Sequence, residues 1–147
     1  MKKVLSLALI LAIAIALPFA FVGCKKQTVV GTWTFSGEYE YEGITESAAV
    51  NEGFVKTAYT KDNMPTITLR KDGTGTTSSK TGSTTISSEV TWTQSGNVVS
   101  VKYTTDFDGE EIEETQELIF KNGKLYFSIM SSEETGNIYN VYAIFTK

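Results

Sequence analysis

The chain has 147 residues, a net charge of −4, one cysteine and no histidine. The missing histidine excludes a Ser-His-Asp triad and a His-ligated zinc site, and a single cysteine excludes an internal disulfide and a Cys-x-x-Cys metal site. The acidic charge gives no electrostatic reason to bind nucleic acid, and the length is typical of one domain.

Residues 1–23 have the layout of a secretory signal peptide. Two lysines precede an apolar run over residues 4–17, and the small residue Gly23 stands directly before Cys24. This segment resembles a bacterial lipoprotein signal, in which the cysteine after the small residue is acylated. The resemblance implies cleavage before Cys24, palmitate on Cys24 and contact with a membrane through that lipid anchor. The alternative is a plain signal peptide or short membrane anchor with an incidental cysteine.

Cleavage before Cys24 removes two lysines and no acidic residue, leaving 11 basic against 17 acidic residues, a net charge of −6. Residues 24–30 then form a short tether, and residues 31–147 form the domain. We expect the protein at the bacterial cell envelope. Lys25 stands where an inner-membrane retention signal often has aspartate, so the resemblance favours the outer membrane if the organism has one.

From Gly31 onward, apolar and polar residues alternate, which indicates β-strands with one dry face and one wet face. Residues 43–64 contain a stretch, 45–60, that the sequence leaves open between a helix and a ninth strand. We expect a longer acidic loop over residues 106–111. The expected strands are 31–42, 66–71, 74–80, 84–94, 98–105, 113–121, 125–130 and 138–146.

Eight antiparallel strands in a meander leave two open edges unless the sheet closes. Eight is a common size for an up-and-down barrel, so we predict an all-β, eight-stranded (or nine-stranded) antiparallel barrel. The last strand is apolar on both faces, and the first strand is its natural partner. A β-sandwich of the same strands is the alternative. We expect a monomer.

The sequence Gly31-Thr32-Trp33 opens the first strand directly after the tether. A meander that begins with Gly-x-Trp resembles the lipocalin-like domains of bacterial lipoproteins, within the calycin group. The resemblance implies that Trp33 plugs one end of the barrel and that Gly31 permits close backbone approach. The arginine that covers this tryptophan late in the chain in that family has no counterpart, since Arg70 is the only arginine.

Neither acidic cluster predicts chemistry. Glu38, Glu40 and Glu42 share the outward face of the first strand, and the acidic run 106–117 lacks the full pattern of a calcium loop, so it is expected to be a solvated loop. We therefore expect no enzyme activity, no catalytic residue, no metal and no cofactor. The segment 74–88, with eleven Ser or Thr in fifteen residues, is expected to form a polar rim hairpin.

The sequence favours a membrane-tethered, lipocalin-like protein that binds a small hydrophobic or amphipathic molecule. The alternative is a surface or periplasmic module with a solid core and no ligand cavity, which contacts a protein or glycan. An apolar cavity open to solvent would distinguish the two. The candidate pocket residues are aromatic side chains with inward parity, namely Trp33, Phe35, Tyr39, Tyr41, Trp92, Tyr103 and Phe127.

Overall fold

The computed structural model describes residues 28–134 and 137–147. The predicted signal peptide, the lipidation site Cys24 and the first part of the tether lie outside these ranges. The described part therefore comprises the end of the tether and the domain expected over residues 31–147.

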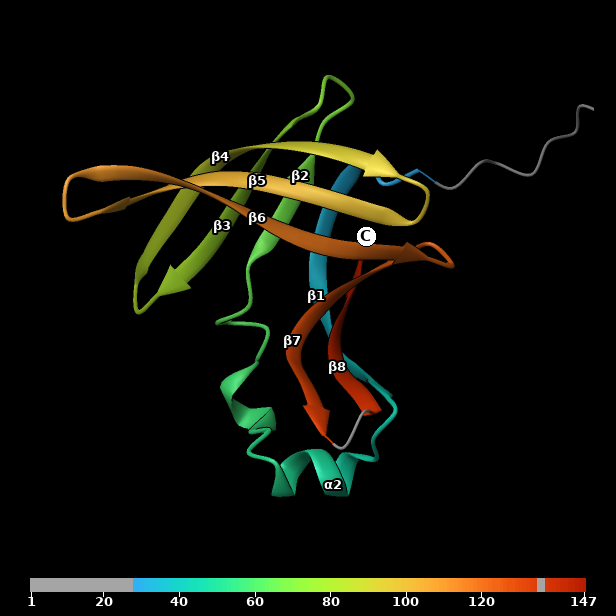
Figure 1. The fold of residues 1–147 in the computed structure, drawn as a ribbon. Coiled ribbons are helices and arrows are strands. Elements are labelled where there is room, and N and C mark those ends of the chain that lie inside the picture. Colours follow the sequence, from blue (N-terminus) through green and yellow to red (C-terminus); the bar gives the residue numbers. More distant parts are fainter. Residues whose placement is uncertain (1–27, 135–136) are drawn as a thin grey trace, which may run out of the picture.

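Eight antiparallel strands form a closed barrel in chain order (Figure 1). Each strand pairs with the next one, and β8 pairs with β1, so the barrel is closed as predicted and the sandwich alternative is wrong. The strands are β1 (Gly31–Glu42), β2 (Thr66–Leu69), β3 (Thr74–Thr81), β4 (Thr84–Ser95), β5 (Val98–Phe107), β6 (Glu110–Lys121), β7 (Lys124–Glu134) and β8 (Asn137–Thr146).

The first and last strands pair in two stretches. Phe35 lies opposite Phe145 and Tyr41 opposite Val141, with a register shift between Phe35 and Tyr39. Gly37 lies in this irregular stretch with a φ of 91°, a conformation that favours glycine. Along these two stretches, β1 runs from the barrel to the segment that connects it to β2 (Figure 1).

Inward-facing apolar side chains form the core of the barrel and alternate with exposed polar ones, as the period-2 pattern predicts. Most of the strands contribute to this core. Its buried members include Trp33, Phe35, Ile67, Leu69, Val90, Val99, Val101, Leu118, Leu125, Ala143 and Phe145.

The barrel is plugged at the end where β1 begins and β8 finishes, which we call the closed end. Trp33 is fully buried there, and its indole Nε1 donates a hydrogen bond of 2.7 Å to the Val29 carbonyl. Phe120 packs edge-on against the Trp33 ring, and the Lys147 ammonium lies over that ring. The placement of Trp33 is the one that the Gly-x-Trp pattern leads us to expect.

The connection between β1 and β2 contains a short helix, α2 (Glu46–Asn51), and a 3-10 turn, η1 (Lys56–Ala58), rather than a ninth strand. Thr45 caps α2 because its hydroxyl accepts a hydrogen bond from the Ala48 amide. Phe54 is buried against Val141 in a second, smaller core under the far halves of β1, β7 and β8.

The predicted acidic loop over residues 106–111 is wrong. β5 and β6 continue to Phe107 and from Glu110, so only Asp108 and Gly109 form the turn. Both adopt positive φ, 57° and 86°, as a tight two-residue hairpin requires. Beyond residue 118 toward this turn, β6 no longer pairs with β7, and the two strands diverge (Figure 1).

Candidate functional site

A cavity of about 200 Å³ lies inside the barrel and is partly open to solvent. It is enclosed by β2, β3, β5, β6 and β7, near the point where β6 and β7 diverge. Its lining is predominantly apolar and consists of Pro65, Ile67, Thr77, Val101, Tyr103, Gln116, Leu118 and Phe127.

Strand register explains why these side chains meet. Ile67 lies directly opposite Thr77, and Val101 directly opposite Gln116, so each pair projects from the same face of the sheet. Leu118 and Phe127 form the corresponding pair between β6 and β7. Because alternate residues share a face, Tyr103 follows Val101 into the same interior.

The polar groups of the cavity are few. Tyr103 lies opposite Glu114 on β6, and its hydrogen bond to the Glu114 carboxylate, together with partial burial, raises the pKa of the Tyr103 phenol above its usual value of 10.0. Tyr103 is therefore a neutral hydroxyl at physiological pH. The Gln116 amide and the Thr77 hydroxyl add hydrogen-bonding groups that can orient a ligand with a polar end.

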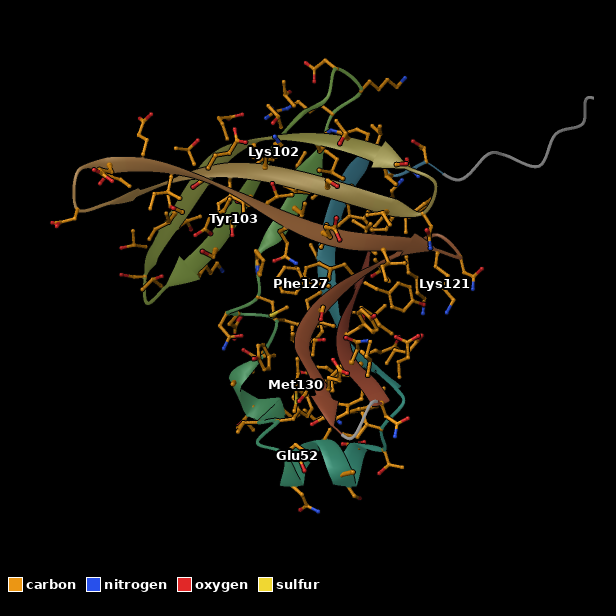
Figure 2. The ribbon with its side chains drawn as sticks, viewed as in Figure 1. Glu52, Lys102, Tyr103, Lys121, Phe127 and Met130 are labelled. Carbon is orange, nitrogen blue, oxygen red and sulfur yellow. The ribbon has the colours of Figure 1, made fainter. Side chains whose placement is uncertain are left out.

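Two of the seven predicted pocket residues line the cavity. Tyr103 stands on its β5 side and Phe127 on its β7 side (Figure 2). Trp33 and Phe35 instead belong to the solid core toward the closed end, where Phe35 packs 5.9 Å from Phe145 between ring centroids. The predicted set is therefore divided between the cavity and the packed core.

Tyr39 and Tyr41 lie further along β1 and do not line this cavity. Their rings pack edge-on against Phe54, at centroid distances of 5.4 and 6.0 Å. The Tyr39 hydroxyl also donates to the Lys56 and Tyr59 carbonyls, which fixes the connecting segment against the strand. These two tyrosines thus hold the helical connection in place.

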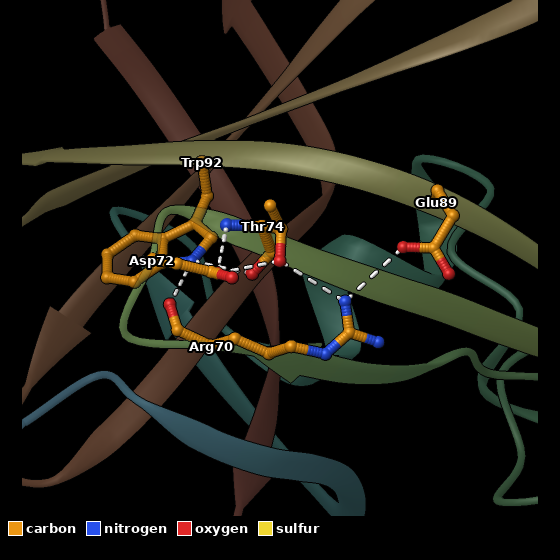
Figure 3. A network of polar contacts seen from close by, with 5 residues as sticks. All are labelled: Arg70, Asp72, Thr74, Glu89 and Trp92. Carbon is orange, nitrogen blue, oxygen red and sulfur yellow. Dashed lines mark hydrogen bonds and ion pairs between the residues drawn. The ribbon is translucent and has the colours of Figure 1, made fainter.

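Trp92 lies at the turn between β2 and β3. Its indole Nε1 donates to the Arg70 carbonyl at 3.0 Å and to the Thr74 carbonyl at 3.1 Å (Figure 3). Asp72 accepts from the Thr74 amide and hydroxyl, and the same network includes the Arg70–Glu89 ion pair at 3.3 Å. Trp92 therefore stabilises the turn between β2 and β3 and does not line the cavity.

The sequence analysis missed the aliphatic part of the lining. Val101 and Leu118 were detectable, because Val101 shares the face of Tyr103 and Leu118 is an inward apolar residue of its strand. Thr77 could also have been named as a pocket residue, because it is a small residue of the hydroxyl-rich segment 74–88, which was expected to lie at the rim of the barrel. Pro65, Ile67 and Gln116 carried no signal beyond strand parity.

A wider depression of about 360 Å³ lies between β1 and the helical connection, but it is shallow and bordered by charged side chains, including Glu38, Glu46 and Lys56. Within residues 28–134 and 137–147, no cluster of acidic side chains has the arrangement of a metal site. The helices in those ranges are all too short or too polar to cross a membrane. The apolar cavity is thus the best candidate site.

Comparison with protein-family models, with curated proteins and with solved structures finds no match to this chain.

Proposed function

We propose that this protein is a lipocalin-like lipoprotein that binds a small apolar or amphipathic molecule at the bacterial cell envelope. The observation that carries the proposal is the partly open, apolar cavity of about 200 Å³ inside a closed eight-stranded barrel. A module with a solid core throughout would have no such space.

The size and chemistry of the cavity define the ligand class. An engineered apolar cavity of about 150 Å³ binds benzene, so this space suits a molecule, or part of one, of roughly one or two rings. Burial of the ligand against Ile67, Val101 and Leu118 supplies hydrophobic free energy. Tyr103 and Gln116 give an amphipathic ligand two polar groups to orient against.

The lipocalin-like assignment is supported by the closed end. Trp33 of the Gly-x-Trp sequence is buried at the start of β1, in the position that the resemblance implies. Lys147, at the C-terminal end of β8, covers the ring with its ammonium 4.8 Å from the ring centroid. A cation therefore lies where the family carries an arginine, although the residue type differs.

A lipid on Cys24 would attach the barrel by its closed end. Thr28, at the start of the described chain, accepts a hydrogen bond from Lys147, and Val29 accepts one from Trp33. Thr28 and Val29 are thus fixed at the closed end, and Thr28 follows the proposed acylation site by four residues. Trp33 does not line the cavity, which is partly open to solvent.

Binding is tested with the neutral fluorophore N-phenyl-1-naphthylamine and purified protein that carries Cys24→Ser, so that no acyl chain competes. Thr77→Phe fills the cavity, whereas Thr76→Phe adds the same ring on the opposite face of β3. We expect fluorescence enhancement with the parent protein and with Thr76→Phe, and at least about tenfold weaker binding for Thr77→Phe. Equal binding by all three proteins would show that the dye does not enter the cavity.

The lipid anchor is tested by incorporation of labelled palmitate. Protein with Cys24 should carry the label, and the Cys24→Ser variant should not. Label on the variant, or none on either protein when a known lipoprotein of the same cells is labelled, would remove the anchor from the proposal.

A further inference from the structure

The β5–β6 hairpin carries an unpaired strand edge. Residues 110–117 of β6 pair with residues 100–107 of β5 on one side, whereas the pairing of β6 with β7 covers only residues 118–121. Figure 1 shows the hairpin projecting beyond the body of the barrel, with β7 turning away from it. The outer edge of this strand is thus unpaired along eight residues, seven of which are exposed.

The hydrogen-bond pattern identifies the free groups. The Phe120 amide donates to the Asn97 carbonyl, so even-numbered residues of β6 direct their backbone groups toward β5. The alternating odd-numbered residues direct theirs away from β5. At residues 119 and 121, the outward backbone groups point toward β7, which pairs with β6 there. Below residue 118, the outward amides and carbonyls belong to Glu111, Glu113, Thr115 and Glu117, and no described strand pairs with them.

The side chains along this edge are mostly negatively charged. Residues 110–117 include five glutamates, and Lys102 is the only basic residue of the hairpin over residues 98–117. Lys102 forms an ion pair of 2.9 Å with Glu113, which leaves the remaining four glutamates in excess. Charges on an edge strand deter pairing with strands of like charge, and like charges directly opposite one another destabilise a sheet.

We propose that the edge of β6 over residues 110–117 binds an extended peptide segment rich in lysine or arginine, which adds to the sheet as a further strand. Main-chain hydrogen bonds to the free groups supply affinity, and pairing of basic side chains with the glutamates supplies selectivity. A second copy of this chain is a poor occupant, because it would set glutamates opposite glutamates. This inference does not depend on the ligand cavity.

The test uses three eight-residue peptides with the full-length protein. Acetyl-(Lys-Val)4-amide can form a strand and is basic, the same peptide with every backbone nitrogen methylated is basic but cannot donate strand hydrogen bonds, and acetyl-(Glu-Val)4-amide forms a strand of the wrong charge. We expect binding of the first alone, weakened by added salt. Equal binding of the N-methylated peptide would mean that charge attraction alone explains the binding, and binding of the Glu-Val peptide would contradict the selectivity; either result overturns the proposal.

A matched pair of variants locates the binding. Thr115→Pro removes one outward amide without removing a hydrogen bond to β5, and Thr115→Val keeps that amide. The Lys-Val peptide should bind at least about tenfold more weakly to Thr115→Pro and unchanged to Thr115→Val. Unchanged binding to both variants would overturn the proposal, as would a protein dimer that Thr115→Pro dissociates.

Amide exchange of the unmodified protein keeps the test valid if Thr115→Pro fails to fold. The Lys-Val peptide should slow exchange at Glu111, Glu113, Thr115 and Glu117, and protection confined to other strands would contradict the proposal. The cavity variant Thr77→Phe should leave peptide binding unchanged, so failure of the ligand proposal and failure of this one are distinguishable.

Discussion

The ammonium of Lys147 lies 4.8 Å from the centroid of the Trp33 ring and donates a hydrogen bond of 2.7 Å to the Thr28 carbonyl. Lys147 is thereby held against the segment that directly precedes β1. A cation over an indole face is attractive, and the buried ring below it fills the closed end of the barrel. The two residues together join the beginning of β1 to the finish of β8.

Removal of the plug should be costly. Trp33→Ala is expected to lower the free energy of unfolding by about 3–5 kcal/mol, because it deletes a fully buried aromatic side chain. Trp33→Phe keeps a ring but loses the hydrogen bond to Val29, so its loss should be smaller. Urea unfolding measures both. A loss under about 1 kcal/mol for Trp33→Ala would mean that the closed end does not depend on this residue.

Two neighbouring tyrosines should respond differently to loss of the hydroxyl. The Tyr39 hydroxyl bonds to two carbonyls of the helical connection, so Tyr39→Phe is expected to cost about 1 kcal/mol. The Tyr41 hydroxyl is buried and has no hydrogen-bond partner among the described residues, so Tyr41→Phe should be neutral or stabilising. Thermal and urea unfolding of the two variants compare them directly. Equal destabilisation would contradict the assigned contacts.

Stability should fall in alkaline solution. Desolvation raises the pKa of Tyr39, Tyr41 and Tyr142, and the hydrogen bond to Glu114 raises that of Tyr103. The folded protein therefore retains these protons to higher pH than the unfolded chain does. Their contribution is fully present below the ordinary value of 10.0 and is lost as the pH rises through the folded values.

Urea unfolding between about pH 8 and pH 11 measures this dependence. Tyr142→Phe should reduce the slope above pH 10, because it removes one of the titrating groups. A free energy of unfolding that stays constant through pH 11, or one that rises, would be inconsistent with raised pKa values at these tyrosines.

The barrel was predictable because its signals are local. Alternation in β1 and glycine-containing turns define the strands, and a last strand apolar on both faces marks the closing partner of the first. The sequence did not distinguish helix α2 from a ninth strand, because the helix has only six residues and one buried alanine, which gives too little periodicity. The acidic turn was misjudged for a related reason. Glutamates on an exposed hairpin have no apolar alternation, and only the pairing with β5 reveals that they are strand residues.

The cavity was only partly predictable, because parity within a strand gives the face of a side chain and not its level along the barrel axis. Trp33, Phe35, Tyr103 and Phe127 all face inward, yet the first two lie in the packed core and the last two border the space. Level depends on the stagger between strands. That stagger becomes known only from the register, such as Val101 opposite Gln116.

The most direct test of the central claim is a map of methyl chemical shifts during titration with N-phenyl-1-naphthylamine. Protein labelled at isoleucine, leucine and valine methyls should show the largest changes at Ile67, Val101 and Leu118, which line the cavity. Ile86 and Ile138 are 54% and 65% exposed and lie outside it, so their methyl signals serve as controls. Changes confined to Ile86 or Ile138, with the three cavity methyls unmoved at saturating dye, would contradict the account.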